Sequence, residues 1–398
     1  MIRYSLIFAL AALPAMAQAQ QTDVMSDISA LVDARSAESA KTARKLWEWA
    51  EVGYQEQKSC GHNLFGAGSV EAAIAVSKWL KQTGTPGRVR LYGTPAEEGG
   101  SGKVYMVRAG LFDDVDFALH WHAGDENSAA ARTTLANRSA KFRFRGTSAH
   151  AAGAPDKARS ALDGVEAFNM MINMMREHVP QESRIHYVIT EGGTAPNVVP
   201  DFAEVFYYVR HPDPAGVDAI WTRLEDAARG AAMGTGTKVD WEVIHGNNPL
   251  LVNESLAKMM DAKLRKVGGI QYTPAEQEFA ENIYASFDKP NNKLGSEKDI
   301  QPYEKSLGYG STDVGDVSYA TPTVGLRTAT WVPGTSAHSW QSSAASGMSI
   351  GFKGTQLAAK TLALAAIELY TNPELRAKAK AEFDDARGPD YQYKSLLG

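Results

Sequence analysis

The chain has 398 residues, of which 44% are hydrophobic and 22% are charged, and its formal net charge is −5. This length and composition suit a globular protein of two domains. No block of sequence is dominated by one sign of charge, so neither nucleic-acid binding nor a polybasic membrane patch is expected.

The first residues have the pattern of a secretory signal. Arg3 precedes the short apolar run SLIFALAALPAM, and small residues suited to cleavage follow at Ala17 and Ala19. The apolar run is too short to span a bilayer well. We therefore expect residues 1–20 to be a cleaved signal peptide. The mature protein is then exported, to the periplasm, without a membrane anchor.

The segments up to residue 133 predict an α/β layer. Apolar residues recur at three- and four-residue spacing over 27–57 and 68–82, which predicts two helices. Strands are predicted at 87–93 and 114–122, with a turn and a helix between them. This alternation of strand and helix is typical of a mostly parallel sheet flanked by helices.

The pattern changes over residues 134–247, where the predicted order is strand, helix, strand, strand, helix, strand. That order is typical of a ferredoxin-like α+β domain. Beyond it the helices return, with a strand at 322–331 and a long polar loop at 287–317. We therefore expect an α/β main domain with a mixed, mostly parallel sheet, made of residues 21–133 and 248–398, with the α+β domain inserted between them.

Four features of the sequence carry side chains that bind metals. Because ligands bind at the carboxyl ends of strands in an open α/β sheet, residues that follow such strands are expected to converge. Thiolate, imidazole and carboxylate are the ligands of zinc-like divalent ions. The four features are Cys60 with His62 in a glycine-flanked loop, Glu97–Glu98, His120 with His122, and His338.

Each feature alone also has an ordinary structural interpretation. A lone cysteine is commonly a buried core residue, adjacent glutamates commonly form a solvated edge, and single histidines commonly make structural hydrogen bonds. Their joint occurrence favours a metal site, because the chain has nine histidines and one cysteine. In an extended segment the two glutamates point in opposite directions, so one can bind metal while the other acts as a general base. A redox-sensing thiol at Cys60 is the remaining alternative.

The chain resembles the aminoacylase/carboxypeptidase family of metal-dependent amidohydrolases in the motifs CGHNLFGAGS, RLYGTPAEEGGSGKVYMVRAGLFDDVD, LHWH, GTSAHAAGAP, TAPNVVPDFAEV and GTSAHSWQ. The likeness covers most of residues 40–370. It is greatest to the branch of hippurate and indole-acetyl-amino-acid hydrolases, and within it to the aminobenzoyl-glutamate utilisation protein B subgroup. It implies hydrolysis of an N-acyl amino acid such as aminobenzoyl-glutamate with two divalent ions (Zn, Mn or Co). It also implies an inserted domain that mediates homodimerisation, or pairing with a homologous subunit.

The resemblance further implies roles for individual residues. Glu97 matches the catalytic general base, and His150 of SAHAA matches a histidine that reaches the substrate, often across a dimer. Asn197 and Arg210 match contacts to the substrate carboxylate, although a turn-capping asparagine and a surface arginine are equally good interpretations. The metal-ligand positions match Cys60, His62, Glu98, His120 and His338, with His122 as the alternative to His120.

One difference from these relatives concerns the sheet. They carry several strands between the first helix, which ends in GYQE, and the CGH motif, whereas here GYQEQKS runs directly into CGHN at residues 59 and 60. Part of the buried sheet that supports the ligands is therefore expected to be missing. Metal ligands must be held to within about 0.5 Å of a productive geometry, and a reduced sheet would hold them less precisely. A second interpretation is therefore a truncated, weakly active or inactive family member that acts by dimerising or by binding a small molecule.

Overall fold

The computed structural model describes residues 24–49, 61–129 and 131–398. The predicted signal peptide, Cys60 and the seam between residues 59 and 60 all lie outside this part of the chain. Within it, none of the helices has the length and apolar character needed to cross a bilayer.

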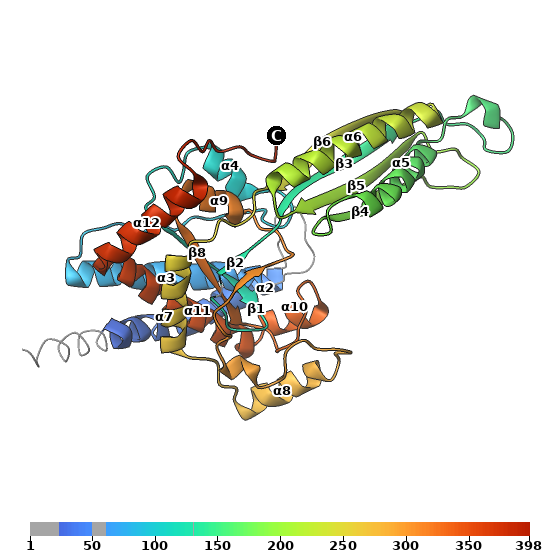
Figure 1. The fold of residues 1–398 in the computed structure, drawn as a ribbon. Helices are drawn as coiled ribbons and strands as arrows, with labels where there is room; N and C mark the ends of the chain where they lie inside the picture. Colours follow the sequence, from blue (N-terminus) through green and yellow to red (C-terminus); the bar gives the residue numbers. More distant parts are fainter. Residues whose placement is uncertain (1–23, 50–60, 130) are drawn as a thin grey trace, which may run out of the picture.

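The inserted domain is a four-stranded antiparallel sheet with two helices on one face. Its strand order is β4-β5-β3-β6, the ferredoxin-like topology predicted from the sequence. In Figure 1 this domain, coloured from teal through green to yellow-green, extends away from the rest of the chain. Its elements are β3 (Ala136–Arg145), α5 (Ala161–Met175), β4 (Arg184–Glu191), β5 (Phe202–His211), α6 (Pro214–Thr235) and β6 (Lys238–Asn247).

The sequence of the inserted domain explains its elements locally. Alternate residues of β5 are buried against the helices, as a half-buried strand requires. The Ser160 side chain accepts a hydrogen bond from Asp163 N and caps α5, and Asp213 caps α6 through Ala215 N. A separate apolar core results, with Phe142, Phe168, Tyr207 and Trp221 among its larger members.

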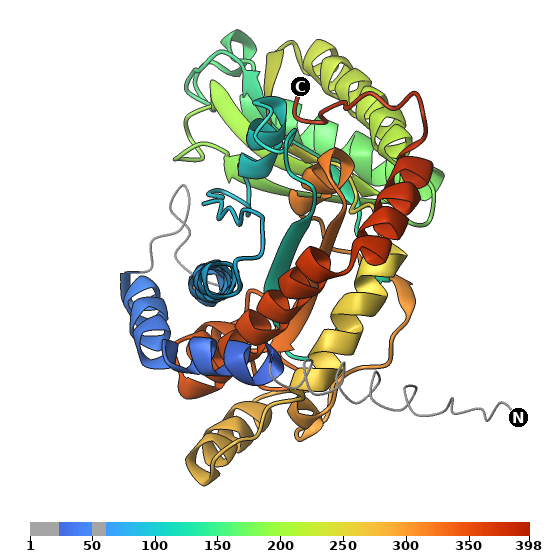
Figure 2. The ribbon, with the colours of Figure 1, turned by 90° about the vertical axis from the view of Figure 1, so that its left-hand side faces the viewer.

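The main domain is built from both sequence halves that flank the insertion. Parallel pairing of β1 with β8, and of β2 with β7, joins the two halves. Figure 2 shows α11 running beside these strands, and α3 packs against β1 and α11. Before the insertion the elements are a helix over 24–33, α2 (Ser36–Trp49), α3 (His62–Thr83), α4 (Gly102–Arg108), β1 (Ala118–Gly124) and β2 (Ala131–Thr133). After it they are α7 (Glu254–Val267), α8 (Pro274–Tyr284), β7 (Lys305–Leu307), α9 (Val314–Ala320), β8 (Thr323–Ala329), α10 (Trp340–Ser346), α11 (Ser349–Thr371) and α12 (Pro373–Arg387).

The predicted α/β fold class is confirmed, but the strand predicted at 87–93 is wrong. Those residues run from α3 towards α4 without strand structure, and no described segment pairs with them. Val89 packs on the main core while Leu91 is 50% exposed. An alternating sequence forms a strand only where a neighbour supplies backbone hydrogen bonds, and that neighbour is absent from the described residues.

Two other predictions need correction. The helix predicted at 27–57 is interrupted by a turn at residues 34–35, and the described part of its second half ends at Trp49. The loop predicted at 287–317 is not structureless, because it holds a 3₁₀ turn (Ser296–Lys298), strand β7 and the start of α9. The pairing of β7 with β2 gives this segment regular structure, which its polar sequence does not predict.

Candidate metal centre

His62 is placed by the start of α3. The preceding residue, Gly61, has φ +100°, and a Cβ atom at that position would lie 2.6 Å from the Cβ of Ala123. Only glycine fits both this left-handed conformation and this close approach to β1. The first turn of α3 therefore brings His62 against the carboxyl end of β1, beside His122.

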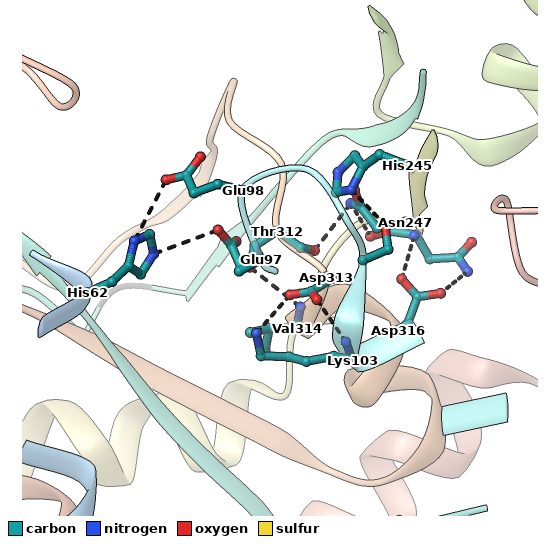
Figure 3. Close-up of polar contacts among 12 residues, drawn as sticks. His62, Glu97, Glu98, Lys103, His245, Asn247, Thr312, Asp313, Val314 and Asp316 are labelled. Carbon is teal, nitrogen blue, oxygen red and sulfur yellow. Dashed lines mark hydrogen bonds and ion pairs between the residues drawn. The ribbon is translucent and has the colours of Figure 1, made fainter. Parts of the chain in front are cut away.

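Glu97 and Glu98 lie in a turn rather than in an extended segment. Ala96 has φ +60°, and Gly100 N donates to Ala96 O at 2.9 Å, which closes the turn. The sequence led us to expect that the two carboxylates point in opposite directions. This expectation is wrong, because the turn brings them to the same side. Both face the imidazole of His62, each at a different ring nitrogen (Figure 3).

The cluster around His62 has ligand-like spacing. Glu97 Oε2 lies 3.7 Å from His62 Nε2, and Glu98 Oε1 lies 4.0 Å from His62 Nδ1. The possible ligand atoms of these three residues all lie within 4.8 Å of one another. Two ligand atoms that each lie about 2 Å from the same divalent ion are separated by up to about 4 Å, which is similar to these distances. His338 joins the cluster from the loop after β8, with its Nε2 atom 3.6 Å from Glu98 Oε1.

His120 and His122 project from the same face of β1, two residues apart. The His122 ring lies 5.5 Å from the His62 ring, and its Nδ1 atom lies 2.7 Å from Ala123 O, so its Nε2 atom is the one available to a ligand. The Nε2 atom of His120 is buried and has no hydrogen-bond partner among the described residues. Its ring covers Gly325 on β8, where a Cβ atom would lie 2.2 Å from Nε2.

The two imidazoles are neutral, which is the form that binds metals. Burial lowers the pKa of His120 to about 3 and that of His122 to about 4. Buried imidazole nitrogens beside two carboxylates fit a divalent cation, because a cation would satisfy the partnerless His120 nitrogen and neutralise the glutamates. The choice between His120 and His122 stays a prediction.

The carboxyl group of Glu97 is held in its ionised form. Burial acts to raise its pKa, but Lys103, His122 and His62, together with a hydrogen bond to Thr312, lower it below the usual value. An ionised carboxylate beside these candidate metal ligands can accept a proton from water.

The turn of Glu97 and Glu98 is anchored on both sides by buried polar contacts, shown in Figure 3. The Lys103 ammonium donates to Asp313 Oδ1 at 2.8 Å, and Lys103 N donates to Asp313 Oδ2 at 2.9 Å. Ser101 Oγ lies 2.6 Å from His245 Nδ1 on β6. The turn is thereby connected both to α9 and to the inserted domain. Sequence reasoning missed these residues, because their partners lie 210 and 144 positions away along the chain.

Backbone strain is concentrated at this centre. In the described part of the chain, three residues other than glycine have positive φ: Ala96 at +60°, Ser101 at +53° and His338 at +58°. Such conformations persist only where the surroundings enforce them, and they cluster at functional sites. All three flank or belong to the cluster, which supports a functional interpretation.

A single cavity of about 330 Å³ connects these residues. Arg210 lines it from the inserted domain, at the end of β5. The structure brings together His62, Glu97, Glu98, His120, His122, Arg210 and His338 around this cavity. Cys60 lies outside the described residues.

His150 and Asn197 do not line the cavity of their own chain. Both are exposed, and the loops that carry them pair through Ala151 N and Asn197 O at 3.0 Å. His150 follows the end of β3 that lies opposite Arg210, and a ten-residue strand spans about 30 Å. The two residues thus stand at the far end of the inserted sheet.

Comparisons with known proteins place this geometry in a family. Residues 43–286 match the model of peptidase family M20/M25/M40. The B subunit of the p-aminobenzoyl-glutamate hydrolase of Escherichia coli (strain K12) is 39% identical over 349 residues, which cover 81% of this chain and 73% of that protein. The Xaa-Arg dipeptidase of Mus musculus is 29% identical over 330 residues, covering 82% of this chain and 69% of that protein.

A solved structure shows the same fold. An aminobenzoyl-glutamate utilization protein from Klebsiella pneumoniae aligns with a TM-score of 0.51 at 20% identity, covering 75% of this chain and 66% of that one. The chain thus spans about two thirds of that protein's length. The family match covers more than half of this chain and agrees with the resemblance seen in its motifs. The chain belongs to peptidase family M20/M25/M40.

Proposed function

We propose that this protein is a metal-dependent amidohydrolase that cleaves the amide bond of an N-acyl amino acid such as aminobenzoyl-glutamate. The observation that carries the proposal is the cluster of His62, Glu97 and Glu98, which shares one cavity with two neutral histidines and Arg210. The names of the relatives support the substrate class, because the B subunit of the p-aminobenzoyl-glutamate hydrolase is 39% identical to this chain.

In this proposal two divalent ions, Zn, Mn or Co, are held by five residues. A bound ion supplies Lewis acidity towards the amide carbonyl and lowers the pKa of water to about 7. Glu97 accepts the proton of the attacking water and later transfers it to the leaving amine. The Arg210 guanidinium holds the carboxylate of the substrate and orients the amide. The proposed metal ligands are Cys60, His62, Glu98, His338 and either His120 or His122.

The test compares two isosteric variants. Glu97→Gln should abolish hydrolysis of aminobenzoyl-glutamate, by about 100-fold or more in kcat, while it keeps the bound metal. Glu98→Gln should lose metal as well as activity, because it removes a ligand. Metal content by elemental analysis and amine release separate the two outcomes. An active Glu97→Gln protein, or metal-loaded native protein without amide hydrolysis, would contradict the proposal.

One observation favours a second candidate, a truncated, weakly active or inactive family member that acts by dimerising or binding a ligand. The sheets of the described main domain are two pairs of strands, and residues 87–93 lack a pairing neighbour. Such a scaffold holds ligands less rigidly than a full sheet. Turnover of the native protein, compared with a full-length relative on the same substrate, distinguishes the two candidates.

The proposed assembly is a homodimer formed through the inserted domain, or a pair with a homologous subunit. β4 is an edge strand, and Val188 on it is 55% exposed. Met170 and Met174 on α5 are 58% and 61% exposed, which leaves an apolar surface beside that edge. A second copy would also supply His150, which lies far from its own cavity. Sedimentation of the native chain against Met174→Lys tests this, because a lysine there should favour the monomer.

The proposed location is the periplasm after removal of residues 1–20. N-terminal sequencing of protein recovered from the exported fraction tests this directly. A start at residue 1 in the recovered protein would contradict cleavage.

A further inference from the structure

Two arginines line the cavity without a carboxylate partner. In the described part of the chain, neither Arg210 nor Arg327 makes a side-chain hydrogen bond or a salt bridge, and Arg210 Nε is buried. Arg210 comes from β5 of the inserted domain, where its guanidinium lies 5.4 Å from the ring of Tyr208. Arg327 comes from β8 of the main domain. The cavity is therefore bounded by one such cation from each domain.

Arg327 stands next to His122, one of the candidate metal ligands. β1 and β8 are parallel, and His122 is paired in register with Arg327. Residues paired across a parallel ladder project from the same face, so the arginine side chain shares the face of His120 and His122. A substrate whose amide lies at the cluster is therefore within reach of Arg327.

The carboxylates closest to Arg327 are engaged elsewhere. Asp125 Oδ2 accepts hydrogen bonds from Asn292 Nδ2 at 2.9 Å and from Gly334 N at 3.0 Å. Glu126 Oε1 lies 3.9 Å from the guanidinium of Arg132. The Arg327 side chain is exposed at the cavity and has no carboxylate partner among the described residues.

We propose that Arg327 binds a second carboxylate of the substrate, while Arg210 binds the first. This inference rests on the proposed function and narrows its substrate class to N-acyl amino acids with two carboxylates. The charges of the cavity support it. Glu97 and Glu98 belong to the cluster with His62. Among the other cations that line the cavity, Lys103 is paired with Asp313 and Arg132 faces Glu126, which leaves Arg210 and Arg327 for the substrate. An amide with a cationic side chain would meet repulsion at the same place.

The experiment uses two isosteric substrates, N-benzoyl-glutamate and N-benzoyl-glutamine, with the full metal-loaded chain. The native protein is expected to prefer the glutamate by about 10- to 100-fold in kcat/KM, because a charge-assisted contact is lost with glutamine. Arg327→Gln should remove most of this preference, and Arg327→Lys should retain part of it. Arg132→Gln is the matched control, which removes a neighbouring charge that already faces Glu126, and it should change the preference by less than about threefold.

Binding separates this inference from the proposed reaction. Dissociation constants of both compounds are measured by calorimetry on metal-loaded Glu97→Gln protein, with and without Arg327→Gln. If the native protein hydrolyses neither compound, the proposed function fails. The role of Arg327 is then tested by the dissociation constant of N-benzoyl-glutamine divided by that of N-benzoyl-glutamate. This ratio should fall about 10- to 100-fold when Arg327→Gln is introduced. An unchanged ratio, or an equal fall in Arg132→Gln, overturns the inference.

Discussion

Replacing Lys103 with methionine should destabilise the main domain strongly. The side chains of Lys103 and Asp313 are 6% and 0% exposed, and Lys103 Nζ lies 2.8 Å from Asp313 Oδ1. Methionine keeps the apolar stem but removes the charge, which leaves the Asp313 carboxylate buried without its counter-ion. Removal of one partner from such a buried pair costs about 3 to 5 kcal/mol. Because Asp313 keeps the hydrogen bond from the backbone N–H of residue 103, the lower end, about 3 kcal/mol, is expected.

This loss should depend on pH. Burial raises the pKa of Asp313, and Lys103 opposes that shift. Without Lys103 the folded-state pKa of Asp313 rises further above its unfolded value of 3.8. An aspartate with a raised pKa stabilises the folded state most below the unfolded pKa, and this stability is lost as pH rises through the folded pKa. The difference between native protein and variant is therefore largest at neutral pH and shrinks towards pH 4.

Urea denaturation of metal-free protein, followed by tryptophan fluorescence, measures this loss. The metal is removed so that ligand binding does not mask the change. The double variant Lys103→Met/Asp313→Asn should recover about 2 kcal/mol, because replacing both charges relieves the unpaired carboxylate. A loss below about 1 kcal/mol for Lys103→Met, or simple additivity in the double variant, would refute the reasoning.

Two further predictions concern histidines. Burial lowers the pKa of His245 from 6.5 to about 4, so the stability that depends on its neutral form is present above pH 6.5 and is lost as pH falls through 4. The free energy of unfolding of the native protein should fall between pH 7 and pH 4.5, and His245→Gln should reduce this fall by about 2 kcal/mol. Urea denaturation at both pH values measures it. An equal fall in the native protein and the variant would contradict this prediction. His120→Ala should lower the metal bound after dialysis, whereas His122→Ala should retain it. The reverse result by elemental analysis would assign the ligand to His122.

Local patterns in the sequence were sufficient for the inserted domain. Alternation along β5 and the caps at Ser160 and Asp213 act over a few residues, so strand and helix periods could be predicted without tertiary information. The order of these elements then led to the observed antiparallel sheet. The motifs also identified the titratable side chains that meet at the cavity, among them His62, Glu97 and His338. His62 opens α3 and His338 follows β8, so their positions agree with ligand binding at the carboxyl ends of strands.

Only the tertiary structure decided the remaining features, since each depends on contacts between distant segments. Residues 87–93 alternate like a strand, yet no segment in the described part of the chain pairs with their backbone groups. The left-handed Ala96 turns both glutamates towards one imidazole, which no residue preference predicts. Lys103 meets Asp313 across 210 positions of sequence, and Arg327 reaches the cavity through its register with His122. The sequence by itself determined which chemical groups the protein carries, and long-range packing decided which of them face one another.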